Sequence, residues 1–174
     1  MNIALFALRI VVGLSFAGHG AQKLFGLFGG GGLEGTAAGF ERMGLRPARM
    51  NALVAGSAEF FGGLLVALGL VTTPAAAALI GVMSTAILTV HWHNGFWSAN
   101  NGVEYNLVLI AAAFALAGVG AGAWSLDHAI GIELTGTGWA LGALALGPLG
   151  GVGAVLAGRL LPQRPSGDPH ASAA

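Results

Sequence analysis

Five long apolar blocks alternate with short polar segments along the chain. The blocks run over about residues 3–27, 51–70, 75–92, 104–121 and 139–161. Their lengths approach or exceed the roughly 20 residues that an α-helix needs to cross a hydrocarbon core of about 30 Å. This pattern predicts an all-α fold, a polytopic membrane helical bundle with a four-helix core and a fifth transmembrane helix.

The polar segments predict how these helices are connected. A glycine run (FGGGG) ends the first block, and residues 33–47 (LEGTAAGFERMGLRP) are typical of a short amphipathic helix at the membrane surface. The short VTTP link makes the second and third blocks an antiparallel hairpin. We expect residues 1–132 to form the four-helix core, residues 133–161 to add the fifth helix, and residues 162–174 to be a disordered tail.

The fifth block is rich in small residues and carries a proline, Pro148, near its middle. A stripe of small side chains lets a neighbouring helix approach closely. The stripe in this block consists of Gly138, Gly142, Gly147, Gly151, Ala154 and Gly158. The alternative is an Ala/Gly-rich span without a close helix contact.

Composition supports a membrane protein and excludes several other classes. Only 8% of the residues are charged and 55% are hydrophobic, whereas soluble domains carry about 25% charged residues. The seven basic residues are balanced by seven acidic ones, so we expect contact with membrane lipid and no nucleic-acid partner. The lack of cysteine excludes thiol relays, disulfides and thiolate metal sites.

Basic residues indicate which way the chain crosses the membrane. They gather around the first connection and after the fifth block, at Lys23, Arg42, Arg46, Arg49, Arg159 and Arg164. Because cytoplasmic segments carry an excess of Lys and Arg, this distribution favours an outside N-terminus and a cytoplasmic first connection. With five spans, the connection between the third and fourth blocks and the C-terminal tail lie on that same side.

Polar residues converge on this side of the predicted bundle. They belong to four different blocks, and the stretch TVHWHNGFWSANNGVEYN supplies several of them. Helical rise places His19 and Glu59 at similar depths, roughly 12 to 14 Å inward from the ends of their helices. The sequence therefore predicts one candidate polar site in the bundle interior, made of His19, Lys23, Glu59, His91, Glu104 and Asn106, with His93 beside them.

Ionisable groups inside lipid are costly unless they are paired or hydrated, and they often face a cavity. Glu59, in GSAEFFGG, is the clearest case because its small neighbours leave room for a helix or a ligand. We expect its carboxyl to be buried and hydrogen-bonded near His19 or His91. A carboxyl that only fixes helix register is the structural alternative, and Lys23 can instead extend to the membrane surface.

Metal binding and nucleotide binding are not favoured. His91 and His93 are two residues apart and project about 200° apart on a helix, so they cannot share one ion while helical. A haem held by His19 and His91 is not required by their spacing. Glycine-rich runs in the last two blocks follow helices, not strands, so they lack the context of a dinucleotide site. Arg9 and Asp127 are expected to form a structural pair at the opposite end of the bundle.

An ordered set of segments resembles the DoxX family of small bacterial membrane proteins. The segments are LRIVVGLSFAGHGAQKLFG, AEFFGGLLVALGLVTTPAA, HWHNGFW and GVEYNLVLIAAAFALAGVGAGAWSLDHAIG, and together they span about residues 5–132. The resemblance implies a four-helix transmembrane core in the bacterial cell membrane. The recurring polar positions of the family map onto His19, Gly20, Lys23, Glu59, His91, Gly95, Glu104, Asn106 and the turn 125–127.

The resemblance also implies a role in redox chemistry. The namesake of the family is similar to a small subunit of a thiosulfate:quinone oxidoreductase, and a mycobacterial relative is linked with superoxide dismutase. One hypothesis is therefore a membrane subunit of a redox or oxidative-stress complex that interacts with a quinone and a redox partner protein. The other is a non-catalytic scaffold or assembly protein whose polar cluster is structural. The sequence leaves the oligomeric state open, a homo-oligomer included.

Overall fold

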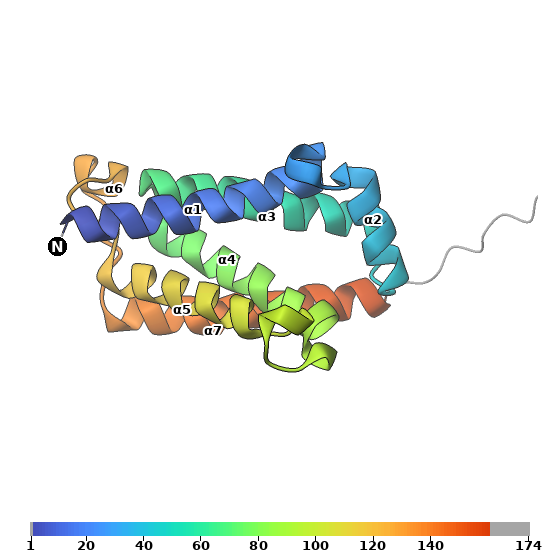
Figure 1. Cartoon of the computed structure of the whole chain (residues 1–174). Helices are drawn as coiled ribbons and strands as arrows, with labels where there is room; N and C mark the ends of the chain where they lie inside the picture. Colours follow the sequence, from blue (N-terminus) through green and yellow to red (C-terminus); the bar gives the residue numbers. More distant parts are fainter. Residues whose placement is uncertain (1, 161–174) are drawn as a thin grey trace, which may run out of the picture.

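Long helices running lengthwise make up the bundle (Figure 1). The structure, a computed structural model of the chain, describes residues 2–160. The long helices in that part of the chain are α1 (Asn2–Phe25), α3 (Ala48–Leu68), α4 (Thr72–Ala86), α5 (Glu104–Val119) and α7 (Thr137–Leu160). Their order and positions confirm the predicted all-α membrane bundle with a fifth long helix.

Short helical segments join the long ones. The elements are η1 (Leu27–Gly29), α2 (Gly32–Arg42), the π-helical turn η2 (Ile87–His91), η3 (Trp92–Asn94), η4 (Ser98–Asn100) and α6 (Leu126–Ala129). The π-helical turn continues α4 directly. Helix α2 occupies most of the segment predicted to form a surface helix, and it crosses one end of the bundle (Figure 1).

Four helical segments in the described part of the chain are long and apolar enough to cross a membrane. They are Asn2–Phe25, Ala48–Leu68, Thr72–Asn94 and Thr137–Leu160, and α5 is a shorter apolar helix. Many large apolar side chains, such as Val11, Leu146 and Leu149, are exposed on the outside of these helices. A lipid environment accounts for that exposure, so the chain is a multi-pass membrane protein.

Glycine brings α1 and α3 into close contact. A Cβ atom on Gly13 would lie 2.5 Å from the Gly63 carbonyl oxygen, and one on Gly20 would overlap the backbone of Phe60. Such close approach is how membrane helices gain packing energy, because burial from lipid gives little hydrophobic gain. Gly20 and Phe60 therefore define the register of the two helices.

A second glycine contact joins α4 and α7. A Cβ on Gly81 would lie 2.8 Å from the Gly147 carbonyl oxygen, and one on Gly151 would lie 2.6 Å from that of Gly81. The predicted small-residue stripe is thus confirmed as a helix contact at Gly147 and Gly151. At Gly138 and Gly142 a Cβ would meet no atom within 4 Å, so this part of the stripe stays open.

Different helices lie at the two ends of the bundle. Helix α6 and the start of α1 lie at one end, whereas α2 lies at the other with the end of α7 (Figure 1). The backbone N–H of Arg46, in the link between α2 and α3, donates to the Gly158 carbonyl oxygen of α7 (2.7 Å). This bond fixes the end of α7 beside α2. The predicted tail, residues 162–174, lies outside the described residues.

Candidate functional site

A buried ion pair joins α1 to α3. The Lys23 ammonium donates to Oε1 of Glu59. The Glu59 side chain is 1% exposed and that of Lys23 is 33% exposed. Glu59 lies near the middle of α3, about 15 Å from either end of the helix. The pair therefore places two charges deep in the membrane-spanning part of the bundle.

Local sequence explains why Lys23 reaches inward. Side chains on a helix tilt toward its N-terminus, and on α1 that direction leads away from α2 toward the middle of the bundle. Gly56 lets α1 lie close to α3 here, because a Cβ at this position would be 3.3 Å from Cβ of Lys23. The expected burial of Glu59 is confirmed, but its hydrogen-bond partner is Lys23, which does not extend to the membrane surface.

The second carboxyl oxygen of Glu59 is also buried. Oε2 has no hydrogen-bond partner among the described residues. A carboxylate oxygen in an apolar interior calls for a donor, such as a water molecule or a proton. The ion pair therefore leaves one buried acceptor of Glu59 available for a further donor.

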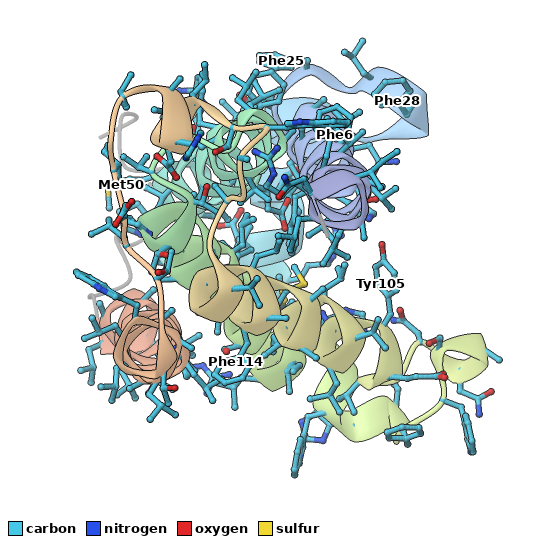
Figure 2. The ribbon with its side chains drawn as sticks, turned by 90° about the vertical axis from the view of Figure 1, so that its left-hand side faces the viewer. Phe6, Phe25, Phe28, Met50, Tyr105 and Phe114 are labelled. Carbon is cyan, nitrogen blue, oxygen red and sulfur yellow. The ribbon has the colours of Figure 1, made fainter. Side chains whose placement is uncertain are left out.

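His19 lies outside the bundle, contrary to the expectation of an interior position. Its side chain is exposed, and its Nδ1 donates to Oε1 of Gln22 (3.0 Å). The ring stands edge-on to Tyr105 at 6.3 Å, and Figure 2 shows Tyr105 pointing away from α5. The reason is angular: the adjacent Gly20 faces α3, and successive helix residues point about 100° apart.

His91 belongs to the connection between α4 and α5. Its Nδ1 donates to the Asn101 carbonyl oxygen (2.7 Å), which also accepts a bond from Nδ2 of Asn94 (3.2 Å). His93, two residues further, is exposed. His91 therefore acts on the shape of this connection, and its ring is half-buried rather than enclosed in the core.

Glu104 stabilises the same connection from the start of α5. Its Oε2 accepts from the backbone N–H of Ser98 (2.9 Å) and from the Ser98 hydroxyl (2.8 Å). Backbone bonds from Val103 to Gly95 and from Glu104 to Phe96 close the loop further. The segment 92–103 is thus a folded loop, and both figures show it projecting from the bundle.

Asn106 is buried between α5 and α4. Its Nδ2 donates to the sulfur of Met83 (3.4 Å), and its Oδ1 has no partner among the described residues. Met83 and Phe16 belong to the central apolar cluster of the bundle. The predicted polar set is therefore divided into a Lys23–Glu59 pair, a loop cluster and a single buried amide.

The separation of the polar residues into three groups bears on metal binding. Among residues 2–160, no group of three or more His, Asp or Glu side chains is arranged to hold a metal ion. The two histidines nearest the bundle, His19 and His91, are each engaged in a local hydrogen bond.

An apolar groove lies beside the ion pair. It is lined mainly by α2, α3, α4 and α7, and Lys23 of α1 reaches it as well. Its volume is about 550 Å³, within the usual range for small-molecule sites. Much of its wall is Ala or Gly, for example Ala58, Gly81 and Gly150. The groove was not predicted from the sequence, although the small residues on the second, third and fifth blocks are the signal that could have indicated it.

Few polar groups line the groove. The hydroxyls of Thr85 and Thr89 already donate to carbonyl oxygens of their own helix. Lys23 has N–H donors beyond the one used by Glu59, and Nδ2 of Asn51 is buried without a partner in the described part of the chain. A ligand here would be apolar, with an acceptor oxygen near Lys23.

The opposite end of the bundle is held by Asp127. Its two carboxyl oxygens accept from the backbone N–H groups of Val71 (2.7 Å) and Thr72 (2.9 Å) at the start of α4. The buried Arg9 guanidinium donates to the Trp124 carbonyl oxygen. Arg9 and Asp127 thus bond to the backbone separately and form no direct ion pair, but the Asp127 carboxylate lies close enough for its charge to act on the Arg9 guanidinium, as expected.

These features define a multi-pass helical membrane protein with a buried ion pair next to an apolar groove. The DoxX family profile matches residues 4–92. An uncharacterised membrane protein of Mycobacterium tuberculosis (strain ATCC 25618 / H37Rv) is 30% identical over 147 residues, which cover 78% of this chain and 86% of that protein. No solved structure matches the chain. The chain belongs to the DoxX family.

Proposed function

We propose that this protein is a membrane subunit of a redox or oxidative-stress complex and that it binds a lipid-soluble quinone in the apolar groove. One observation carries the proposal: Lys23 lines the groove and also pairs with the buried Glu59. The same ammonium group can therefore contact a ligand while it is paired with a buried carboxyl.

Charge at the ion pair favours a neutral ligand. The positive charge of Lys23 is balanced by Glu59, so an anionic headgroup would meet little net attraction. A quinone offers uncharged carbonyl oxygens, which accept hydrogen bonds from an ammonium group. Reduction of a quinone also takes up protons and electrons in equal number, and the carboxyl nearest to Lys23, that of Glu59, is linked to the groove through this ammonium group.

Electrons must come from another protein in this proposal. The chain has no cysteine, and its described residues hold no metal-binding group. The folded loop 92–103 offers a docking place for a redox partner, because Trp92, Phe96 and Trp97 are all at least half exposed. The rings of Phe96 and Trp97 stand edge-on at 5.1 Å, which presents a preformed aromatic surface. The isolated chain is then expected to turn over no substrate.

A scaffold function is the second candidate. It is favoured by the loop cluster, in which His91 and Glu104 each form hydrogen bonds within the α4–α5 connection. In that case the Lys23–Glu59 pair fixes the register of α1 and α3, and the groove is filled by ordinary lipid.

Binding of a quinone to the purified protein separates the two candidates. We suggest a soluble benzoquinone analogue, protein in lipid nanodiscs, and the single variant Lys23→Met. The proposal predicts saturable binding to the wild-type protein and a loss of about tenfold or more in affinity for the variant, which keeps the side-chain bulk but has no donor.

Partner recruitment is tested by affinity purification of the tagged protein from its host in mild detergent. The expected result is co-purification of a protein with a redox cofactor, reduced when both Phe96 and Trp97 are replaced by serine. A wild-type protein that binds no quinone and recruits no redox protein would support the scaffold instead. Turnover of a quinol by the isolated chain would show that it is an enzyme.

A further inference from the structure

A second apolar cavity lies along α4 and α7. It has a volume of about 660 Å³ and is lined by Thr73, Pro74, Ala77, Gly138, Trp139, Gly142, Ala143 and Leu146. Ala77 and Leu146 also line the groove beside Lys23. The two cavities therefore adjoin at these two residues, and we call them together the channel.

Helix contacts give the length of this channel. Helices α4 and α7 run parallel, because Ala77 and Gly81 contact Gly147 while Thr85 contacts Gly151. Lys23 reaches the channel near the level of Thr85, since its Cβ contacts Gly56 and the Gly62 position contacts Leu79. From that level to Trp139 the channel follows α7 for about 20 Å.

We infer that this channel binds the long hydrocarbon tail of the quinone, with the headgroup at Lys23 and the tail lying along the line of contact between α4 and α7 toward Trp139. The inference rests on the proposed function and adds the ligand class to it, namely quinones with a long polyisoprenoid tail. The shared residues Ala77 and Leu146 place the second cavity next to the headgroup groove. A short-tailed quinone would leave the second cavity to bilayer lipid.

The shape of the tail must match the channel, because an apolar character alone gives no preference for the channel over the bilayer. Bilayer chains are as apolar as the channel wall, so transfer from lipid gives no hydrophobic gain. Selectivity then comes from packing against a shaped wall. The open glycines Gly138 and Gly142 supply that shape, because a Cβ at either would meet no atom within 4 Å and the space beside them belongs to the second cavity.

Three glycines of α7 make a matched set for the test. Gly142 lines the second cavity, Gly150 lines the groove beside Lys23, and Gly153 lines neither. A Cβ at each of them would meet no atom within 4 Å, so a side chain at any of the three begins in open space and not against a neighbouring helix. We therefore expect Gly142→Leu to block binding of the tail and Gly150→Leu to block binding of the headgroup. Gly153→Leu is the control that should block neither.

Binding to nanodiscs is measured for two probes with the same benzoquinone headgroup, one with a long polyisoprenoid tail and one without a tail. We expect wild type and Gly153→Leu to bind the long-tailed probe at least about fivefold more tightly. Gly142→Leu should abolish this preference and leave the tailless probe unchanged. Gly150→Leu should weaken both probes.

The possible failures can be told apart. Equal binding of the two probes to wild type, or an unchanged preference in Gly142→Leu, would overturn the tail assignment while the proposed quinone site stands. Absence of binding by either probe would overturn both. A dimer that is lost in Gly142→Leu, with quinone binding unaffected, would assign the second cavity to another copy of the chain.

Discussion

Lys23 lies close to the end of α1, yet its ammonium points into the bundle and pairs with Glu59 at the middle of α3. Taking two charges out of water is costly, and a pair repays this only when both partners are present. The contact therefore makes each residue depend on the other. It also brings the only basic group of the groove lining to a position where membrane ligands can reach it.

Removing one member of the pair should destabilise the protein. Lys23→Met leaves a buried carboxylate, and we expect a loss of about 2–4 kcal/mol in unfolding free energy, reduced by the partial exposure of Lys23. Adding Glu59→Leu should restore most of this stability, because no uncompensated charge remains. Unfolding in mixed micelles followed by circular dichroism measures the effect. Equal losses that simply add in the double variant would show that the two residues do not interact.

Close contact between α1 and α3 should tolerate no side chain at Gly20. We expect Gly20→Ala to cost about 1–3 kcal/mol, because the new methyl group would overlap the Phe60 backbone. Gly18→Ala is the matched control on the same helix, since a Cβ there meets no atom within 4 Å. It should stabilise by about 0.5–1 kcal/mol. Similar thermal unfolding of the two variants would contradict the observed packing.

The start of α4 should depend on Asp127. Its carboxylate takes the place of a helix cap for Val71 and Thr72, so Asp127→Ala is expected to cost about 1–2 kcal/mol. Hydrogen exchange at these two amides should rise more than in the rest of α4. Glu133→Ala, an exposed acidic residue nearby in sequence, is the control. Unchanged exchange at Val71 and Thr72 in Asp127→Ala would exclude the capping role.

The sequence predicts the fold well because apolar length is a local property. Each of the five apolar blocks corresponds to a long helix, and the amphipathic segment after the first block contains α2. The depth of Glu59 was also predictable, because helical rise converts sequence position directly into distance.

Partners of the polar residues were harder to predict than their depth. The face on which His19 and Lys23 lie is set by the glycine contacts of α1 with α3, and these involve segments about 40 residues apart. The groove depends on contacts between α4 and α7 that are still further apart along the chain. Periodicity within one helix carries no information on such contacts, so the groove and the Lys23–Glu59 pair required the structure.

The backbone of loop 92–103 should become more mobile when the carboxylate of Glu104, which binds Ser98 in this loop, is removed. Glu104→Gln weakens the two bonds from Ser98, because a charged acceptor binds more strongly than an amide oxygen. We expect faster hydrogen exchange in residues 95–103, no large change in global unfolding, and weaker recruitment of the redox partner. If exchange increases while recruitment is unchanged, this loop is not the docking surface.

Photolabelling tests the quinone site most directly. A benzoquinone that carries a photoreactive azide on its ring is added to the wild-type protein in nanodiscs, and the labelled residues are identified by mass spectrometry. We expect labels near Lys23, on α3 around Ala58 and on α7 around Gly150, and we expect them to be lost in Gly150→Leu and retained in Gly153→Leu. Labels confined to the outer face around His19 and Tyr105, or unaffected by Gly150→Leu, would contradict it.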